Sequence, residues 1–243
     1  MIEARDLAKR FGAVEAVRHV SFTAPDGFIT GLLGPNGAGK TTTLRMIATL
    51  VRPSQGRALV DGIDAAEDPL GVRARIGVLS DARGLYVRLT ARENIAYYGA
   101  LRGMERPAID AAIARLADLL DLTALLDRRT DGFSQGERMK VAIARTLIHD
   151  PPNVMLDEPT NGLDVMTTRK LREVVRQLRE DGKCVLFSSH VMQEISALCD
   201  EIVILAKGSV VAHGKAEELL LASGCATLED AFVELSGEGA AAA

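Results

Sequence analysis

The sequence predicts an α/β fold, and two features of its patterning carry that prediction. Three short apolar runs are each followed by a helical pattern: residues 28–33 before 40–50, 153–157 before 165–181, and 184–189 before 190–200. Strands that are apolar throughout and alternate with helices are typical of a parallel sheet covered on both faces. Between about residues 90 and 150 the strand patterns disappear, which indicates a helical insertion. We therefore expect a parallel core with an N-terminal antiparallel β subdomain and an inserted α-helical subdomain.

Two other segments predict antiparallel strands. Residues 2 to about 30 alternate apolar and polar positions in short runs, and "GRALVDGID" adds a strand that ends in the turn signal Asp61-Gly62. Further along, "EIVILAKGSVVAHG" reads as a hairpin with Lys207-Gly208 as its turn. Two short helical patterns follow, and "GEGAAAA" is expected to be a frayed tail.

The helical insertion has its own start signals. Thr90 and Glu93 form a capping box in "LTARENI", and Pro107 opens a second helix. Apolar residues recur at helical spacing after it, at Ile109, Ile113, Leu116 and Leu120. We expect one domain over residues 1–243: a core with its β subdomain at about 1–80 and 151–220, the helical subdomain at about 81–150, and a C-terminal helix and tail at about 221–243.

Composition narrows the class of protein. The chain has 243 residues, of which 47% are hydrophobic and 26% charged, with a net charge of −4. This balance is typical of a globular protein, and the charge argues against a nucleic-acid partner. The three cysteines have no C-x-x-C spacing and fit a reducing compartment. No run approaches the 18 apolar residues of a membrane span, so we expect a chain that is neither secreted nor membrane-spanning.

The most specific motif is "GPNGAGKT", Gly34 to Thr41, which matches G-x-x-x-x-G-K-[ST] after an apolar strand and before a helix. Glycines let backbone N–H groups surround phosphate oxygens, and the helix N-terminus adds partial positive charge. Lys40 would reach the β and γ phosphates, and the Thr41 hydroxyl would face Mg²⁺. The predicted ATP-binding residues here are Gly34, Pro35, Asn36, Gly37, Ala38, Gly39, Lys40, Thr41 and Thr42.

Two carboxylates and a histidine follow neighbouring apolar strands. Asp157 and Glu158 end the run "NVMLD" and should lie at the edge of the sheet where the glycine loop also emerges. Asp157 would hold Mg²⁺, and Glu158 would polarise the water that attacks the γ-phosphate. His190 follows "CVLFSS" and should reach the same edge, although a lone histidine is more often a helix-start or core residue.

Together these motifs resemble those of the ATP-binding-cassette (ABC) ATPases, the nucleotide-binding subunits of ABC transporters, and the resemblance covers nearly the whole chain. The chain has the family's motifs in the family's order: the glycine loop, the signature segment "FSQGER", "DEPT", "GLD" and the switch histidine, His190. The resemblance implies a P-loop NTPase fold with a RecA-like parallel core, ATP and Mg²⁺ as cofactors, and catalytic roles for Glu158 and His190.

The segment "FSQGER" by itself is typical of a helix that begins with an N-cap serine. It stands where the family has Leu-Ser-Gly-Gly-Gln, which binds the ATP held by the other subunit of a head-to-tail dimer. The resemblance therefore implies that Ser134, Gln135, Gly136 and Glu137 act on a partner's nucleotide. Gln135 and Glu137 depart from the family's glycine and glutamine.

Three further roles come from the same resemblance. Phe11 would stack on adenine, with a surface aromatic of a β-strand as the alternative, and Asp164 would link the two sites across the dimer. Asp81 stands where the family has a glutamine that touches Mg²⁺ and signals to the membrane partner, so it is either a metal ligand or a solvated loop residue.

The finer resemblance is to the sodium-extrusion subgroup of bacterial exporters, through "HDPPNVMLDEPTNGLDV", "LFSSHVMQE" and "TLEDAFVEL". It implies a homodimer at the cytoplasmic face of the inner membrane, bound to a separately encoded permease that exports sodium, another small ion or a drug. The alternative is a soluble ABC ATPase acting on ribosomes or chromosomes, but the chain has neither tandem cassettes nor a long coiled-coil insertion.

Overall fold

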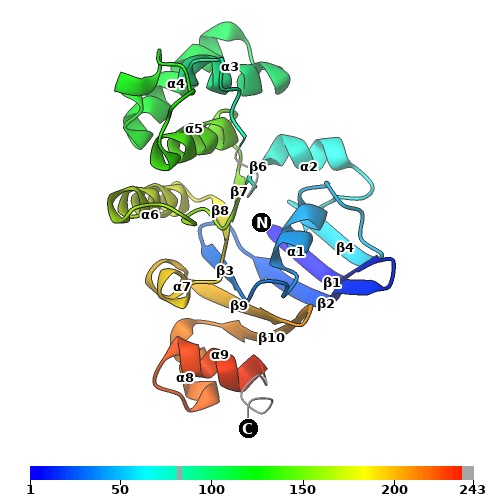
Figure 1. Ribbon diagram of the computed structural model, residues 1–243. Helices are drawn as coiled ribbons and strands as arrows, with labels where there is room; N and C mark the ends of the chain where they lie inside the picture. Colours follow the sequence, from blue (N-terminus) through cyan, green and yellow to red (C-terminus); the bar gives the residue numbers. More distant parts are fainter. Residues whose placement is uncertain (81–83, 237–243) are drawn as a thin grey trace.

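The computed structural model describes residues 1–80 and 84–236, and the strands within them form one ten-stranded sheet (Figure 1). In space the strands follow the order β5-β4-β1-β2-β10-β9-β3-β8-β7-β6. Their bounds are β1 Ile2–Phe11, β2 Val14–Ala24, β3 Ile29–Leu33, β4 Gln55–Val60, β5 Ile63–Asp64, β6 Ile76–Leu79, β7 Asn153–Asp157, β8 Cys184–Ser189, β9 Glu201–Ala206 and β10 Ser209–Gly214.

The helices are α1 Lys40–Ile47, α2 Pro69–Arg75, α3 Ala91–Leu101, α4 Arg106–Leu120, α5 Gln135–Leu147, α6 Val165–Glu180, α7 Met192–Leu198, α8 Ala216–Ser223 and α9 Leu228–Ser236, with a 3₁₀ turn at Thr123–Leu125. Among the described helices none combines the length and the apolar character that crossing a membrane requires.

One half of the sheet is parallel, as predicted. Strands β9, β3, β8, β7 and β6 are joined by parallel pairings. Successive side chains in these strands belong to different hydrophobic cores: Met155 lies in the core that contains α1, whereas Val154 and Leu156 lie in the core that contains α6 and α7. Because side chains alternate between the two faces of a strand, burial on both faces explains why these strands are apolar throughout.

The other half is antiparallel except where β10 meets β2, which is a parallel pairing, and its turns have the expected geometry. β1 pairs with both β2 and β4 in antiparallel register. Asp61 and Gly62 join β4 to β5 with φ of 50° and 78°, and Lys207 and Gly208 join β9 to β10 with φ of 49° and 80°. Two successive residues with positive φ make the tight turn that matches the twist of a hairpin.

The helical insertion, α3 to α5, lies at one end of the parallel strands, at the top of Figure 1. The capping box is present: the Thr90 hydroxyl accepts from the Glu93 N–H at 3.1 Å, and the Thr90 N–H donates to the Glu93 carboxylate at 2.7 Å. The four periodic apolar residues of α4 are buried, as their spacing predicts: Ile109, Ile113, Leu116 and Leu120.

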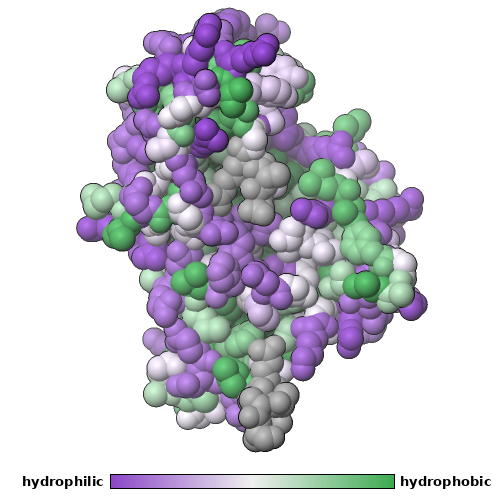
Figure 2. All heavy atoms as spheres, in the orientation of Figure 1, coloured by the Kyte–Doolittle hydropathy of each residue, from purple (hydrophilic) through white to green (hydrophobic). Residues whose placement is uncertain are grey.

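Figure 2 shows that hydrophilic residues predominate over this insertion, while hydrophobic ones gather beside the N-terminal strands and α2.

Two elements have no clear signal in the sequence. β6 has four residues and is completed by its parallel pairing with β7, from Ile76 opposite Asn153 to Leu79 opposite Leu156. α2 has seven residues and is capped by Asp68, which accepts from the Gly71 N–H at 2.8 Å. Both are shorter than the window over which hydrophobic periodicity can be detected.

Candidate active site

The glycine loop joins β3 to α1 and is shaped by close backbone contacts. A Cβ at Gly34 would lie 2.4 Å from the main-chain oxygen of Leu205 in β9. Gly39 has a φ of 102°, and a Cβ there would lie 2.8 Å from the main-chain oxygen of Ala16 in β2. Both positions therefore need glycine so that the loop can fold against its neighbouring strands.

Lys40 is the first residue of α1, and its side chain is 5% exposed. Its ammonium donates to the main-chain oxygens of Gly34, at 2.5 Å, and Pro35, at 3.3 Å. It also lies 3.3 Å from Oε1 of Glu158. A buried ammonium needs such partners. The loop and Glu158 therefore hold a positive charge beside the N-terminal end of α1, where the helix adds partial positive charge.

An open cleft of about 680 Å³ lies in front of this lysine. Most of the predicted ATP-binding residues line it, together with residues that sequence reasoning missed in β2 and in the loop after β7. The lining residues are Val14, Glu15, Ala16, Pro35, Asn36, Gly37, Gly39, Lys40, Thr41, Thr42, Glu158, Asn161 and His190. The β2 residues lie far from the loop in sequence and carry no motif, so the pairing of strands alone brings them to the cleft.

The ends of β7 and β8 meet through a buried serine. The Ser188 hydroxyl donates to Oδ1 of Asp157 at 2.6 Å and accepts from the N–H of Glu158 at 3.0 Å. Asp157 is 4% exposed and Ser188 is fully buried. Glu158 has a φ of 47°, an uncommon backbone conformation for a residue with a side chain. The serine thus fixes the strand end at which the chain turns from Asp157 to Glu158.

His190 and Glu158 are in direct contact. Nδ1 of the imidazole lies 2.8 Å from Oε2 of Glu158, and the other carboxylate oxygen faces Lys40. The three side chains come from α1, from the loop after β7 and from the loop after β8. The structure brings the predicted pair Glu158 and His190 together with Lys40 in one cleft.

The signature segment lies outside this cleft, at the start of α5. Ser134 is its N-cap: the hydroxyl accepts from the Glu137 N–H at 3.2 Å, and the Ser134 N–H donates to the Glu137 carboxylate at 2.8 Å. Glu137 also lies 3.4 Å from the guanidinium of Arg128. Glu137, the departure from the family's glutamine, therefore completes a capping box.

Gln135 and Gly136 contact the segment that follows β7. The Gln135 amide donates to the main-chain oxygen of Asn161 at 3.1 Å, and a Cβ on Gly136 would lie 2.8 Å from the hydroxyl of Thr167. Asp164 caps α6, accepting from the N–H of Thr167 at 2.9 Å and from its hydroxyl at 2.7 Å. These hydrogen bonds lower the pKa of Asp164.

The predicted adenine contact lies outside the cleft. Phe11, at the end of β1, is 48% exposed and is not among the residues that line the cleft. Its ring lies 5.1 Å from the ammonium of Lys9. Asp81 falls outside the described residues.

Comparison with known proteins gives the family. The sequence pattern of the ABC transporter family matches residues 17–161. The chain is 48% identical over 224 residues to the ABC transporter ATP-binding protein NatA of Bacillus subtilis, covering 90% of this chain and 91% of that protein.

Solved structures agree with the sequence match. A structure described as the ATP-binding subunit of an ABC transporter superposes with a TM-score of 0.89 at 28% identity, covering 97% of this chain and 99% of the other. The ATP-binding cassette MJ0796, solved as a dimer in a post-hydrolysis state with ADP and Pi, has a TM-score of 0.80 at 27% identity, covering 88% of this chain and 98% of the other. The chain belongs to the ABC transporter ATPase family.

Proposed function

We propose that this chain binds ATP in the cleft beside the glycine loop and hydrolyses it with Glu158 and His190, as a single cassette domain. The observation that carries the proposal is the line of contacts from Lys40 through both oxygens of Glu158 to His190, at 3.3 and 2.8 Å. A cation, a carboxylate and an imidazole beside a phosphate-binding loop supply the charge and the proton acceptor that phosphoryl transfer to water needs.

Each residue has a distinct role in this proposal. The loop N–H groups and Lys40 bind the β and γ phosphates, and the carboxylate of Glu158 accepts the proton of the attacking water. His190 holds that carboxylate through Nδ1 and orients it. Val14, Glu15 and Ala16 extend the cleft beyond the loop, so the nucleoside would lie along β2. Phe11, the proposed adenine contact, pairs with Val14 across the β1–β2 hairpin.

Mg²⁺ fits the oxygen donors at this edge of the sheet. The Thr41 hydroxyl lines the cleft, and the carboxylate of Asp157, which ends β7 directly before Glu158, is a second hard oxygen donor that Ser188 orients at 2.6 Å. In the described part of the chain no group of three acidic, histidine or cysteine side chains forms a complete metal cage. This suits a metal that keeps waters and shares its remaining ligands with phosphates. Bound there, the ion would neutralise charge on the phosphates.

The active unit in this proposal is a homodimer in which each subunit offers Ser134 and Gly136 to its partner's ATP. The exposed position of Ser134, at the N-terminal end of the thirteen-residue helix α5, supports this role, because a helix N-terminus favours an anion. The resolved dimer of the similar cassette MJ0796 also supports it.

The test of the ATPase function is a phosphate-release assay on the purified chain, with Mg²⁺ and with EDTA. We expect Mg²⁺-dependent release that rises more than linearly with protein concentration, because two subunits complete each site. Single variants Lys40→Ala and Glu158→Gln should each abolish most of the activity. Activity that is unchanged in both variants would contradict the proposal.

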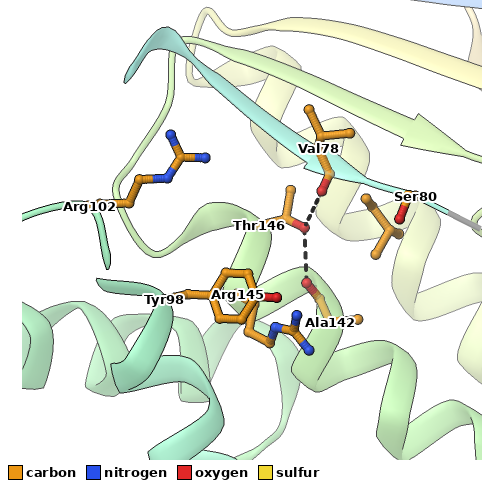
Figure 3. Close-up of a pocket in the computed structure, with 8 residues that line it drawn as sticks. Val78, Ser80, Tyr98, Arg102, Ala142, Arg145 and Thr146 are labelled. Carbon is orange, nitrogen blue, oxygen red and sulfur yellow. Dashed lines mark hydrogen bonds between the residues drawn. The ribbon is translucent and has the colours of Figure 1, made fainter. Parts of the chain in front are cut away.

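We further propose that the chain works at the cytoplasmic face of the inner membrane, bound to a separate permease. The relatives described above are named as ABC transporter proteins, which favours this over a role on ribosomes or chromosomes. A pocket of about 180 Å³ lies between β6 and the helices α3 and α5, and it shares no lining residue with the ATP cleft (Figure 3). Arg102 and Arg145 line it, and the Arg145 guanidinium stacks 3.8 Å from the centre of the Tyr98 ring.

Two guanidinium groups at one pocket would donate hydrogen bonds to an acidic side chain of the permease. Charge reversal at Arg145 should therefore weaken co-purification with the proposed permease while leaving ATPase activity of the isolated subunit intact. Following the resemblance to the sodium-extrusion subgroup, we propose sodium as the exported solute. Sodium efflux from vesicles containing both proteins, compared with potassium and with a cationic drug, decides among the solutes.

A further inference from the structure

Behind the catalytic pair lies a second carboxylate, Glu194, to which the proposed mechanism gives no role. It sits on α7, four residues after His190, and is 8% exposed. Among the described residues no lysine, arginine or histidine forms an ion pair with it. A buried carboxylate without a cation is costly to retain, so its hydrogen bonds indicate what it does.

Those hydrogen bonds join the two loops that carry the catalytic residues. One oxygen, Oε2, accepts from the Thr160 hydroxyl at 2.6 Å and from the Ser189 hydroxyl at 3.0 Å. Thr160 stands two residues after Glu158, and Ser189 directly precedes His190. All three side chains are at least nine-tenths buried. Both hydroxyls donate to this one oxygen, so Glu194 fixes the direction in which each hydroxyl points.

This orientation fixes the backbone on both sides of His190. With its proton directed to Glu194, the Ser189 oxygen turns a lone pair toward the N–H of Val191, from which it accepts at 3.0 Å. The residue before the histidine and the residue after it are thus tied to the same carboxylate. In the loop after β7, Thr160 ties the segment that carries Glu158 to that carboxylate as well.

We propose that Glu194 is a positioning residue for ATP hydrolysis, which holds the loops of Glu158 and His190 together through the hydroxyls of Thr160 and Ser189. It acts without touching the nucleotide and in addition to Ser188, which joins Asp157 and Glu158 to β8. The inference rests on the proposed ATPase function. Its physical basis is that a displacement of about 1 Å in a catalytic group can cost about 10²-fold in rate.

The experiment compares Glu194→Ala with Glu194→Gln in steady-state ATP hydrolysis by the full chain. We expect Glu194→Ala to lower kcat about 10- to 100-fold with KM for ATP within about twofold, because Lys40 and the glycine loop are untouched. Glu194→Gln should remain within about threefold of the wild type, because its amide oxygen can accept from both hydroxyls. The matched control is Gln193→Ala, one position before Glu194. It removes a 2.7 Å hydrogen bond to Glu229 and should leave kcat unchanged.

A second comparison separates positioning from general stability. In a His190→Ala background, Glu194→Ala should lower kcat by less than threefold, because the contact between Glu158 and His190 that it aligns is already lost. If Glu194→Ala is poorly folded, Thr160→Val and Ser189→Ala each remove one donor and should each lower kcat several-fold. A Glu194→Ala enzyme with wild-type kcat, or a Glu194→Gln enzyme as impaired as Glu194→Ala, would overturn the proposal. A wild-type chain without ATPase activity would instead overturn the proposed function.

Discussion

The ammonium of Lys40 lies 3.3 Å from a carboxylate oxygen of Glu158, in a cleft where the two side chains are 5% and 14% exposed. A phosphate group entering the cleft therefore meets a lysine that already has an anionic partner. Glu158 has two opposed effects here: it supplies the proposed proton acceptor, and it competes with phosphate for the lysine.

The first prediction separates those effects. Glu158→Gln removes the negative charge and the proton acceptor while keeping the shape, so ATP affinity should be equal to or higher than that of the wild type. Turnover should fall by about 10²- to 10⁴-fold, the usual range for lost acid-base help. Nucleotide binding by fluorescence titration and single-turnover hydrolysis measure the two quantities. Single-turnover hydrolysis at close to the wild-type rate would remove Glu158 from this role.

The second prediction concerns the signature segment. Ser134→Arg should leave ATP binding by the monomer nearly intact and prevent ATP-driven dimerisation and hydrolysis, because the long cation would occupy the place of the partner's γ-phosphate. Size-exclusion chromatography of the Glu158→Gln background with ATP and Mg²⁺ detects the dimer.

The matched control for that experiment is Ser134→Thr, which keeps the hydroxyl that caps α5 by accepting from Glu137 at 3.2 Å. This variant should still dimerise. If Ser134→Arg dimerises equally well, the segment is a helix cap without a role at the partner's site.

The third prediction tests the contact between Gln135 and the loop after β7. Gly162 has a φ of 73°, and a Cβ there would lie 2.3 Å from the Gln135 amide nitrogen. Gly162→Ala should therefore lower the free energy of unfolding through backbone strain and through this overlap. In a Gln135→Ala background only the strain remains, so the loss should be smaller by about 0.5 kcal/mol or more.

Gly182→Ala is the control for the strain. Gly182 has a φ of 78° and nothing within 4 Å of the Cβ position, so this variant reports the cost of the backbone conformation without an overlap. Urea unfolding of the nucleotide-free chain measures all four variants. Equal losses for Gly162→Ala with and without Gln135 would contradict the prediction, because the Gln135 side chain would then move aside without cost.

The fourth prediction concerns pH and His149, near the end of α5. Burial, and then the positive charge of Arg102, lower the pKa of His149 from 6.5 to about 4. Its Nδ1 is buried without a hydrogen-bond partner in the described structure. Between pH 6.5 and 4 the unfolded chain binds a proton that the folded chain does not. The stability from keeping this histidine neutral is thus fully present above pH 6.5 and is lost as the pH falls toward 4, by at most about 3 kcal/mol.

His149→Gln should flatten this part of the pH dependence, because glutamine does not titrate, while its amide can still donate to the Ile76 oxygen that His149 Nε2 contacts at 3.3 Å. Urea midpoints at pH 7.5, 6, 5 and 4 give the profile. His19→Gln, at a histidine whose side chain is 72% exposed, controls for loss of a histidine as such. Parallel profiles for wild type and His149→Gln would contradict the prediction.

The sequence by itself determined the elements that local chemistry specifies. The glycine loop, the apolar strands of the parallel core, the capping box at Thr90 and the N-cap serine at Ser134 all follow from residues within one turn or one strand of each other. The hairpin turns at Asp61-Gly62 and Lys207-Gly208 are equally local, because positive φ at two successive positions depends on the residues that occupy them.

The tertiary structure alone decided which distant residues meet. β6 exists because β7 pairs with it, and Ala16 approaches Gly39 because β2 folds across the glycine loop. Glu194 accepts hydrogen bonds from Thr160, which is 34 residues away in sequence, and from Ser189, which is 5 residues away. Neither hydroxyl belongs to a motif that predicts such a partner. The physical reason is that burial makes these polar groups depend on one another: once solvent is excluded, each donor must find an acceptor, and only the packed fold determines which one is within reach.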